Sequence, residues 1–534
     1  MNKAKICVNQ FCQKQFEITD QDRQFYQKMA VSEPKFCFNC RQQQKLAFRN
    51  ERKLYHNVCK LCKKPFISIY SKDKEYPVFC AGCWWRDGWN PLDYGRDFDF
   101  NRPFFEQLKE LWDAVPKLGL LTLGDMVNSD YCHDAYRLVN CYLTFDGEQA
   151  KDCYYGETFS NLQSCCDFLF VQRCELCYEL ANCNDCYNVN FSRYSYNCSD
   201  SSFLFSCRSC RNCFACANLQ QKEYHIFNKP YSPEEYKKIV ESFNLDSYAA
   251  LQKFKKEVEE FYQKFPKKYL NGVMNENVTG DNLNGCKDTF DSYDCANLRD
   301  CRYCTNMFMG ASDCYDVNMW GDNLSMAYNS VGIGAGAQNI VASFYAAFGV
   351  NNIYHSIFCV HDAQNMFGCV GIQHKNFCIL NKQYSKEEYE KLVPRIIEHM
   401  CKDVRAHGAS EIESHGSQLS ETELKNQEWG EFFPPSLSAF GYNETVAQEY
   451  YPLTKEQAVL QGFKWKDPDP KEYIKQTYKI SDAIKDVPNG ITKEILACGD
   501  CGKNFKIVIQ ELNFYRKKNM PIPHKCADCR HIDR

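Results

Sequence analysis

Six closely spaced cysteine pairs, gathered at the two ends of the sequence, constrain this chain more than any other feature. They are Cys7/Cys12, Cys37/Cys40, Cys59/Cys62, Cys80/Cys83, Cys498/Cys501 and Cys526/Cys529. Two cysteines on one tight turn, met by two on another, form the tetrahedral thiolate cage that zinc prefers. The pairs therefore predict three Zn²⁺ sites of four cysteines each. Because four thiolates leave no open position on the metal, we expect all three sites to be structural rather than catalytic.

The first and last sites are copies of one sequence module. A shift of 489 positions places Cys12, Cys37 and Cys40 on Cys501, Cys526 and Cys529, and Phe16, Tyr26 and Arg41 on Phe505, Tyr515 and Arg530. The middle site is a shorter version of the same pattern. A module of this size buries too little apolar surface to fold alone, so zinc would supply much of its folding free energy. The sequence predicts zinc ribbons at residues 1–55, 56–90 and 491–534.

Charge and cysteine content bear on the compartment and on possible partners. The first apolar residues belong to a cysteine knuckle rather than to an export signal, and zinc-type spacing favours reduced thiols, so we expect a cytoplasmic protein. No apolar run approaches the length of a membrane span. Residues 1–90 carry 17 Lys and Arg against 8 Asp and Glu, whereas residues 127–228 carry 7 against 12. The basic end favours an acidic partner, and the acidic centre favours a basic one.

The middle of the chain contains a second duplication, with an offset of 153 positions. His225–Ser232 recurs as Cys378–Ser385, and each copy leads into an amphipathic helix that Ser232 or Ser385 would cap. We expect two homologous halves at residues 127–273 and 274–405, a helical spacer at 91–126, and a connector at 406–490.

A finer period within each half predicts its fold. Asn140, Asn161 and Asn182 recur at steps of 21, and so do Asn297, Asn318 and Asn339. Short apolar runs broken by Asn, Asp, Gly and Ser at such a period are typical of a parallel β-solenoid. We expect one coil for each step of 21, with four or five coils in each half. The fold class is mostly β with small α segments: a duplicated parallel β-solenoid flanked by four-cysteine zinc ribbons, two N-terminal and one C-terminal.

Three roles are open to the central cysteines: small core residues, further metal ligands, or redox partners. Cys177/Cys186 and Cys210/Cys213/Cys216 resemble metal clusters in their spacing. At the offset of 153, however, Cys210 becomes Ala363 and Cys213 becomes Met366. Apolar residues at the copied positions favour a core role.

The complete arrangement resembles a known group of proteins. A phenylalanine four residues after the second cysteine, a Phe-Tyr pair, a proline and a closing Cys-x-x-Cys-Arg are similar to the zinc-ribbon (treble-clef-like) domain family. Together with Asn140–Leu143, Cys174–Tyr178 and Asn212–Asn218, they make the chain resemble the cysteine-rich zinc-ribbon proteins of candidate-phyla-radiation bacteria. The resemblance implies zinc and this architecture, and it implies no established biochemical role.

The leading functional hypothesis is a non-enzymatic binding or scaffold protein. Basic residues of the ribbons, interleaved with aromatic residues, could contact the phosphates of RNA or of a ribonucleoprotein. These residues are Arg41, Lys45, Arg49, Arg52, Lys53 and Arg530. The alternative is a protein–protein scaffold that uses the solenoid face. The sequence carries no signal for a small-molecule substrate or for a particular oligomeric state.

A third hypothesis is a carbohydrate-active enzyme, because parallel β-helices host enzymes with paired carboxylates. The candidate residues are Asp288, Asp291, Asp294 and Asp300, with His355, His361 and Asp362 further along the chain. Aspartates in a turn-rich repeat are usually solvated turn formers. We therefore expect no enzymatic activity and assign no catalytic residue.

Overall fold

The computed structural model describes residues 3–321, 326–334, 338, 340–402, 428–467 and 473–534. It divides the chain into two compact units, which we treat separately. Unit 1 comprises residues 1–119 and 269–466, and unit 2 comprises residues 120–268 and 467–534. The end of the predicted second half (403–405), parts of the predicted connector (406–427 and 468–472) and Asn339 of the predicted period lie outside the described residues.

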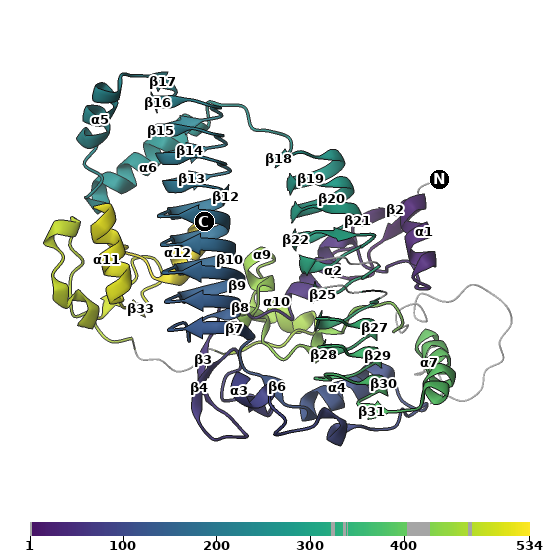
Figure 1. The fold of residues 1–534 in the computed structure, drawn as a ribbon. Coiled ribbons are helices and arrows are strands. Elements are labelled where there is room, and N and C mark those ends of the chain that lie inside the picture. The colour runs from purple at the N-terminus through teal and green to yellow at the C-terminus, as the bar shows by residue number, and fades with distance from the viewer. Residues whose placement is uncertain (1–2, 322–325, 335–337, 339, 403–427, 468–472) are drawn as a thin grey trace. The chain divides into compact units, whose positions relative to one another are not determined.

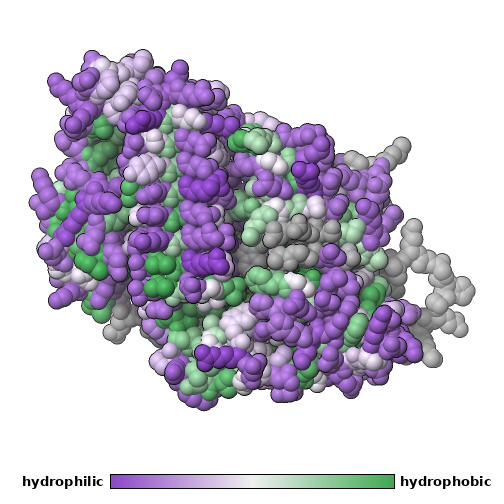
Figure 2. All heavy atoms as spheres, viewed as in Figure 1, coloured by the Kyte–Doolittle hydropathy of each residue, from purple (hydrophilic) through white to green (hydrophobic). Residues whose placement is uncertain are grey.

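The body of unit 2 is a parallel β-solenoid (Figure 1). Its strands stack in chain order, each hydrogen-bonded to the next. They are β7 (Thr122–Val127), β8 (His133–Val139), β9 (Tyr142–Lys151), β10 (Tyr154–Gln163), β11 (Cys166–Glu175), β12 (Tyr178–Asn184), β13 (Tyr187–Arg193), β14 (Ser199–Phe205), β15 (Arg211–Ala217) and β16 (Glu223–Ile226). Figure 2 shows the exposed side chains of this stack as columns, most of them polar. Such columns arise because neighbouring coils align equivalent positions.

The coil of this solenoid repeats every 12 positions, so the predicted period of 21 is wrong. Tyr154 pairs with Tyr142 on one side and with Cys166 on the other, a step of 12 positions in each direction. A residue with positive φ recurs at every third position, as at Asn140 and Leu143. The coil is thus built from four sides of three residues. A spacing of 21 is seven such sides, which returns to a different side of the solenoid rather than to the same one.

The short sides explain why the core consists of small residues. Three residues of extended chain span about 10 Å, so the interior receives one side chain from each side and has little room. Cysteine is small and apolar enough to fill such a position. Cys141, Cys153, Cys165 and Cys177 stack in the core of unit 2 at steps of 12. Their thiols donate hydrogen bonds to backbone carbonyls, as from Cys177 Sγ to the Glu175 oxygen at 3.2 Å.

The solenoid of unit 1 is less regular. Its strands are β18 (Gly272–Val273), β19 (Glu276–Asn284), β20 (Lys287–Ala296), β21 (Leu298–Arg302), β22 (Thr305–Met307), β23 (Ala311–Ser312), β24 (Asn318–Gly321), β25 (Val331–Gly334), β26 (Phe344–Ala347), β27 (Asn351–Tyr354), β28 (Ile357–Val360), β29 (Gln364–Phe367) and β30 (Asn376–Ile379). Its first pairings advance by 11 positions, as between Glu276 and Lys287, and the next advance by 12, as between Thr289 and Cys301. Later coils advance by 13, as between Val331 and Phe344. The extra residue first appears where the buried Met307 and Ala311 stand four positions apart.

Both solenoids end in the same way. Short hairpin strands, β17 (Lys229–Pro230) and β31 (Lys382–Gln383), turn the chain back, and helices α5 (Pro233–Ser242) and α7 (Lys386–Cys401) follow. Ser232 and Ser385 each form a capping box, which confirms the two predicted N-caps. In unit 2, α6 (Tyr248–Tyr262) then packs its apolar face on the solenoid through Phe254.

An asparagine closes the last coil in each unit. Asn381 accepts a hydrogen bond from the Val370 N–H at 2.7 Å and donates one to the Val370 carbonyl at 2.8 Å. Asn228 bonds to both backbone groups of Ala217 in the same manner, at 2.9 Å each. The side-chain amide therefore satisfies the backbone groups that a further coil would otherwise pair.

Replacing Asn381 with alanine should destabilise unit 1 by about 1–3 kcal/mol, because two buried backbone groups of Val370 lose their partner. Chemical denaturation of the full chain measures the change. Asn381 has φ of +60°, a region that alanine disfavours, so Asn381→Gly separates the two causes. The glycine variant should also lose stability. A glycine variant as stable as the unaltered chain would assign the cost to backbone strain instead.

Further elements surround the solenoid of unit 1. They include the 3₁₀ helix η1 (Pro91–Tyr94), α4 (Phe104–Ala114), β6 (Lys117–Leu118), η3 (Pro435–Leu437), η4 (Tyr442–Glu444), α9 (Ala447–Tyr450) and α10 (Lys455–Leu460). Helix α4 buries Phe104, Leu108 and Leu111 along one face. The Glu428 carboxylate accepts hydrogen bonds from the N–H groups of Phe104 and Phe105 at its N-terminus. None of the described helices has the length and apolar character that crossing a bilayer requires.

Buried histidines make the stability of both units depend on pH. Burial lowers the pKa of His133 in unit 2 to about 3, and the pKa of His355 in unit 1 is lowered to the same value for the same reason. The His133 Nδ1 atom accepts a hydrogen bond from the Leu121 N–H at 3.0 Å, so the ring is neutral in the folded protein. Between pH 6.5 and 3 the unfolded chain binds the extra proton, and stability therefore falls as the pH falls.

The variant His133→Gln should remove this contribution. Across pH 6 to 4 its free energy of unfolding should fall less steeply than that of the unaltered chain, by about 1.4 kcal/mol per pH unit. Urea denaturation of both proteins at several pH values measures the difference, and loss of zinc in acid affects both alike. Equal slopes would contradict the assignment of a neutral His133.

Candidate metal centres

The N-terminal ribbon positions four cysteines by a hairpin and a helix. Strands β1 (Lys3–Ile6) and β2 (Gln15–Ile18) pair antiparallel, and Cys7 and Cys12 lie in the turn between them. Helix α1 (Asp20–Lys28) follows, and Cys37 is the N-cap of α2 (Phe38–Leu46), which carries Cys40 in its first turn. A cysteine pair on a hairpin thus faces a second cysteine pair at a helix N-terminus, as the spacing of the four cysteines predicts.

The other two ribbons repeat this plan. The middle one uses β3 (Tyr55–Val58), β4 (Pro65–Ser68), β5 (Val78–Phe79) and α3 (Ala81–Trp84). The C-terminal one uses β32 (Leu496–Ala497), β33 (Asn504–Phe505), α11 (Ile509–Lys518) and α12 (Ala527–Asp533), preceded by η5 (Ile484–Asp486) and η6 (Asn489–Lys493). Cys80 and Cys526 are the N-caps of α3 and α12. The two N-terminal ribbons belong to unit 1, and the C-terminal ribbon belongs to unit 2.

The sulfur atoms of each ribbon converge. The ligand atoms of Cys7, Cys12, Cys37 and Cys40 all lie within 4.8 Å of one another, and the same is true of Cys59, Cys62, Cys80 and Cys83 and of Cys498, Cys501, Cys526 and Cys529. Individual Sγ–Sγ distances are 3.7 Å for Cys12–Cys37, 3.9 Å for Cys62–Cys80 and 3.7 Å for Cys501–Cys526. Four sulfurs at about 2.3 Å around a tetrahedral zinc would stand about 3.8 Å apart. All three groups fit a zinc ion.

Backbone donors favour the ionised form of one thiol in each ribbon. The N–H of Cys37 points to Cys7 Sγ at 3.3 Å, that of Cys80 to Cys59 Sγ at 3.4 Å, and that of Cys526 to Cys498 Sγ at 3.3 Å. Burial opposes ionisation of Cys498, but the backbone N–H groups of Cys501, Cys526 and Asp500 outweigh it and lower the pKa of that thiol to about 6. In the first ribbon burial prevails and raises the pKa of Cys7. The C-terminal ribbon therefore favours one thiolate, the form that binds metal.

In unit 1, helix α2 holds the first ribbon against the solenoid through a buried ion cluster. Arg41 and Lys45, one helical turn apart, both reach Asp316. The Arg41 Nε donates to the Asp316 carboxylate at 2.9 Å, and Lys45 also donates to the Asp316 carbonyl. All three side chains are at most 3% exposed. Burial alone would lower the pKa of Arg41, yet the Asp316 carboxylate more than offsets this and raises it.

The same cluster occurs in unit 2 at the copied positions. Arg530 of α12 and Arg534, the C-cap of that helix, both pair with Asp167, at 3.1 and 2.8 Å. They stand 489 positions after Arg41 and Lys45. Asp316 and Asp167 both have positive φ on a solenoid corner. Each unit therefore joins one terminal ribbon to one half-solenoid by an i, i+4 basic pair and one buried aspartate, which we call the ribbon clamp.

A second acidic residue of each terminal ribbon also forms an ion pair at the interface with the solenoid. Glu511 of α11 accepts hydrogen bonds from Tyr155 at 2.7 Å and from Tyr515 at 3.0 Å, and it pairs with Arg530 at 3.4 Å. In unit 1 the copied acid, Asp22, pairs with Arg302 at 3.1 Å. Through these contacts each buried polar group has a hydrogen-bond or ion-pair partner. Burial of an unpaired polar group would destabilise the interface between ribbon and solenoid.

The clamps correct the predicted nucleic-acid contacts. Arg41, Lys45, Arg49 and Arg530 are buried. Arg41 and Lys45 pair with Asp316, and Arg530 pairs with Asp167. The Arg49 Nε donates to Glu51 at 2.6 Å. A phosphate cannot reach these cations in this fold. Arg52 and Lys53 remain half-buried. Sequence reasoning noted the periodic basic residues on a helix but could not see the aspartates, which lie 271 to 363 positions away.

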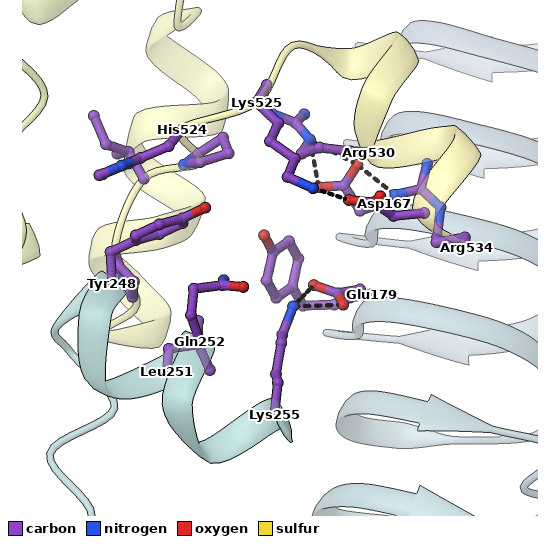
Figure 3. Close-up of a pocket in the computed structure, with 15 residues that line it drawn as sticks. Asp167, Glu179, Tyr248, Leu251, Gln252, Lys255, His524, Lys525, Arg530 and Arg534 are labelled. Atoms are coloured by element: carbon purple, nitrogen blue, oxygen red, sulfur yellow. Dashed lines mark hydrogen bonds and ion pairs between the residues drawn. The ribbon is translucent and has the colours of Figure 1, made fainter. Parts of the chain in front are cut away.

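A small pocket lies beside the clamp of unit 2 (Figure 3). Its volume of about 70 Å³ has room for only a few water molecules. Tyr248 stacks on His524 with ring centroids 3.6 Å apart. The charged groups at its walls pair with one another, as Lys255 does with Glu179 at 2.6 Å. The pocket is thus lined by neutralised ion pairs.

The other predicted residues occupy structural positions. Cys186, Cys210, Cys213 and Cys216 lie in the solenoid core of unit 2 beside Cys177, and their thiols donate to backbone carbonyls two residues earlier. Asp291 pairs with Arg302 at 2.9 Å. The Asn282 side chain donates to Asp294, and burial raises the pKa of Asp294 to about 6. Asp300 is exposed.

Comparisons with known proteins leave the family open. No family model matches the chain, and no curated protein matches it. One solved structure, described as a "putative acetyltransferase" from Desulfovibrio desulfuricans G20, is similar over 43% of this chain and 65% of its own, with 10% identity and a TM-score of 0.11. The chain thus spans about two thirds of that protein, and a likeness this low carries no argument about fold or activity.

Proposed function

We propose that this protein is a non-enzymatic scaffold in which three structural zinc ions hold ribbons as braces on two half-solenoids, and that the solenoid surface binds a protein partner. The observation that carries the proposal is the ribbon clamp together with the closed four-sulfur groups. Every ligand position on a zinc in such a group would be taken by cysteine, so the metal would serve the fold. The ribbon helices use their cations to bind the solenoid.

Protein is favoured over RNA because of where the charges lie. The clamp buries three of the six cations expected to meet phosphate, and Arg49 is buried with Glu51. Residues 127–228 contain 12 acidic and 7 basic residues. Because Asp134, Asp146, Glu157 and Asp167 are buried, eight acidic and seven basic residues remain at the surface of the first half-solenoid. A surface with nearly balanced charge lacks the excess of cations that binding to a phosphate backbone requires. Solenoids also present long, regular faces, which suit extended protein contacts.

The test is to recover crosslinked partners of the full chain from its native cells, with and without nuclease, at rising salt. The proposal predicts a protein partner whose recovery survives nuclease at every salt concentration. A purified RNA mixture should show no affinity for the chain above that of a neutral control protein. Recovery that depends on intact RNA would contradict the proposal and restore the nucleic-acid hypothesis.

A further inference from the structure

Three cysteines outside the ribbons converge in the solenoid core of unit 1. Cys301 and Cys314 have their sulfurs 3.2 Å apart, and those of Cys304 and Cys314 are 3.8 Å apart. All three ligand atoms lie within 4.8 Å of one another, and none of the residues is more than 1% exposed. These separations are as short as those within the four-cysteine ribbons, where the Sγ–Sγ distances are 3.7 to 3.9 Å.

The fold brings these sulfurs together at one corner. Cys301 and Cys314 stack on adjacent coils, since their neighbours Arg302 and Tyr315 form a parallel bridge. Cys304 lies one three-residue side further along the first coil. In unit 2, Cys174, Cys177 and Cys186 have the same relation within a coil of the regular length. Among the described residues those three do not form such a group.

The difference lies in coil length. Cys301 and Cys314 are separated by 13 positions, one more than the regular step, and the stretch between them includes the longer side from Met307 to Ala311. Thiols of both units donate to carbonyl oxygens, as those of Cys177 and Cys301 do. Among the described residues, solenoid cysteines meet as a group of three sulfurs only at this corner.

We propose that Cys301, Cys304 and Cys314 form a fourth metal site, a three-thiolate site for copper(I). Thiolates are soft ligands that select copper(I), zinc and iron–sulfur clusters. Zinc in a structural site takes four ligands. No fourth cysteine, histidine or carboxylate of the described chain belongs to this group, and its burial excludes a water ligand. A soft ion that accepts three sulfurs matches this donor set.

The charge around the site suits an anionic complex. Copper(I) bound by three thiolates carries two negative charges after three protons leave as the thiols bind. The buried ammonium of Lys45 donates to the carbonyl of Asp316, two residues after Cys314, and Arg41 pairs with the carboxylate of the same Asp316. Two cations and one carboxylate therefore lie close to this segment, an excess of positive charge that suits an anionic complex.

The test uses the full chain, produced in cells with copper-supplemented medium because the buried site must load as the coil folds. Zinc and copper per chain are counted after purification with a reductant that lacks thiols. We expect one copper per chain with three zinc ions retained, and a copper absorption edge with three sulfur neighbours. Cys304→Ala, produced in the same medium, should retain at most a tenth of that copper per chain. Cys177→Ala, its counterpart in unit 2, should keep the copper content of the unaltered chain.

The inference uses none of the twelve ribbon cysteines, so it can fail while the proposed function stands. Equal copper binding by the unaltered chain and Cys304→Ala would overturn it. Copper that enters only as zinc leaves would also overturn it, because the ribbons would then be the site. Retention of three zinc ions in Cys304→Ala reports that this variant still folds. A disulfide between Cys301 and Cys314 in the copper-supplied chain would count against the site as well.

Discussion

Replacing Cys40 with serine should lower the zinc content of the purified chain from three ions to two and release the N-terminal ribbon from unit 1. Cys40 supplies one of four converging sulfurs, and a three-sulfur site with a weak hydroxyl ligand holds zinc far less tightly. Structural zinc contributes about 10–16 kcal/mol in small zinc-finger peptides, which is more than a module of this size gains from its core. The loss should therefore unfold the ribbon locally.

Zinc per chain, measured by elemental analysis, and limited proteolysis within residues 1–55 read out this effect. The variant should be cleaved near α2, because without zinc the N-terminus of this helix is no longer bound to the hairpin that carries Cys7 and Cys12. Cys401→Ser is the matched control: this cysteine of the same unit is exposed and belongs to none of the four-cysteine groups. The control should keep three zinc ions. Three zinc ions in Cys40→Ser would show that this group is not a zinc site.

Removing the shared carboxylate of a ribbon clamp should cost about 3–5 kcal/mol of unfolding free energy. In Asp167→Asn the side chain keeps its size but loses its charge, and Arg530 and Arg534 share it. Both guanidinium groups are at most 9% exposed, so water cannot replace the missing partner. Breaking a buried ion pair on one side is strongly destabilising for this reason.

Asp185→Asn is the matched control in the same solenoid. Asp185 has the same φ as Asp167, +57°, so backbone effects of the substitution cancel. Its partner Arg173 is 52% exposed, and such surface pairs contribute about 0–1 kcal/mol. Chemical denaturation of both variants, monitored with a probe in unit 2, gives the two free energies of unfolding to compare. Equal stabilities would mean that the ribbon clamp does not hold the C-terminal ribbon in place.

The sequence predicted the three four-cysteine groups and the class of fold because both depend on local patterns. Two cysteines on a tight turn and a phenylalanine four residues on are visible in any printed sequence, and the repeated ribbon adds independent support. The duplicated helix caps at Ser232 and Ser385 were visible for the same reason. Local chemistry at these positions decides the structure without help from distant residues.

The coil length was missed because two spacings compete in the sequence. Each side of the coil has three residues, so corner residues with positive φ and core residues both recur at multiples of three positions. The asparagines at steps of 21 share this period but lie on different sides. The steps of 12 between Cys141, Cys153 and Cys165 carry the true coil length. Only hydrogen-bond register, as between Tyr154 and Cys166, distinguishes the two.

The role of the basic ribbon residues could not be predicted from the sequence, because it depends on pairing across long stretches of chain. Arg41 and Asp316 are 275 positions apart, and Arg530 and Asp167 are 363 apart. A basic helix face has the same pattern whether it meets phosphate or a buried aspartate. The duplicated positions offered one clue, since both copies carry a basic pair four residues apart, Arg41 with Lys45 and Arg530 with Arg534.

The central claim is that twelve cysteines hold three zinc ions as closed structural sites. X-ray absorption at the zinc edge of the purified full chain, combined with a count of zinc per chain, tests it most directly. The account predicts three zinc ions per chain, each with four sulfur neighbours at about 2.3 Å and no oxygen or nitrogen neighbour. Fewer than three ions in protein kept reduced throughout, or a zinc shell that contains water or histidine, would contradict it.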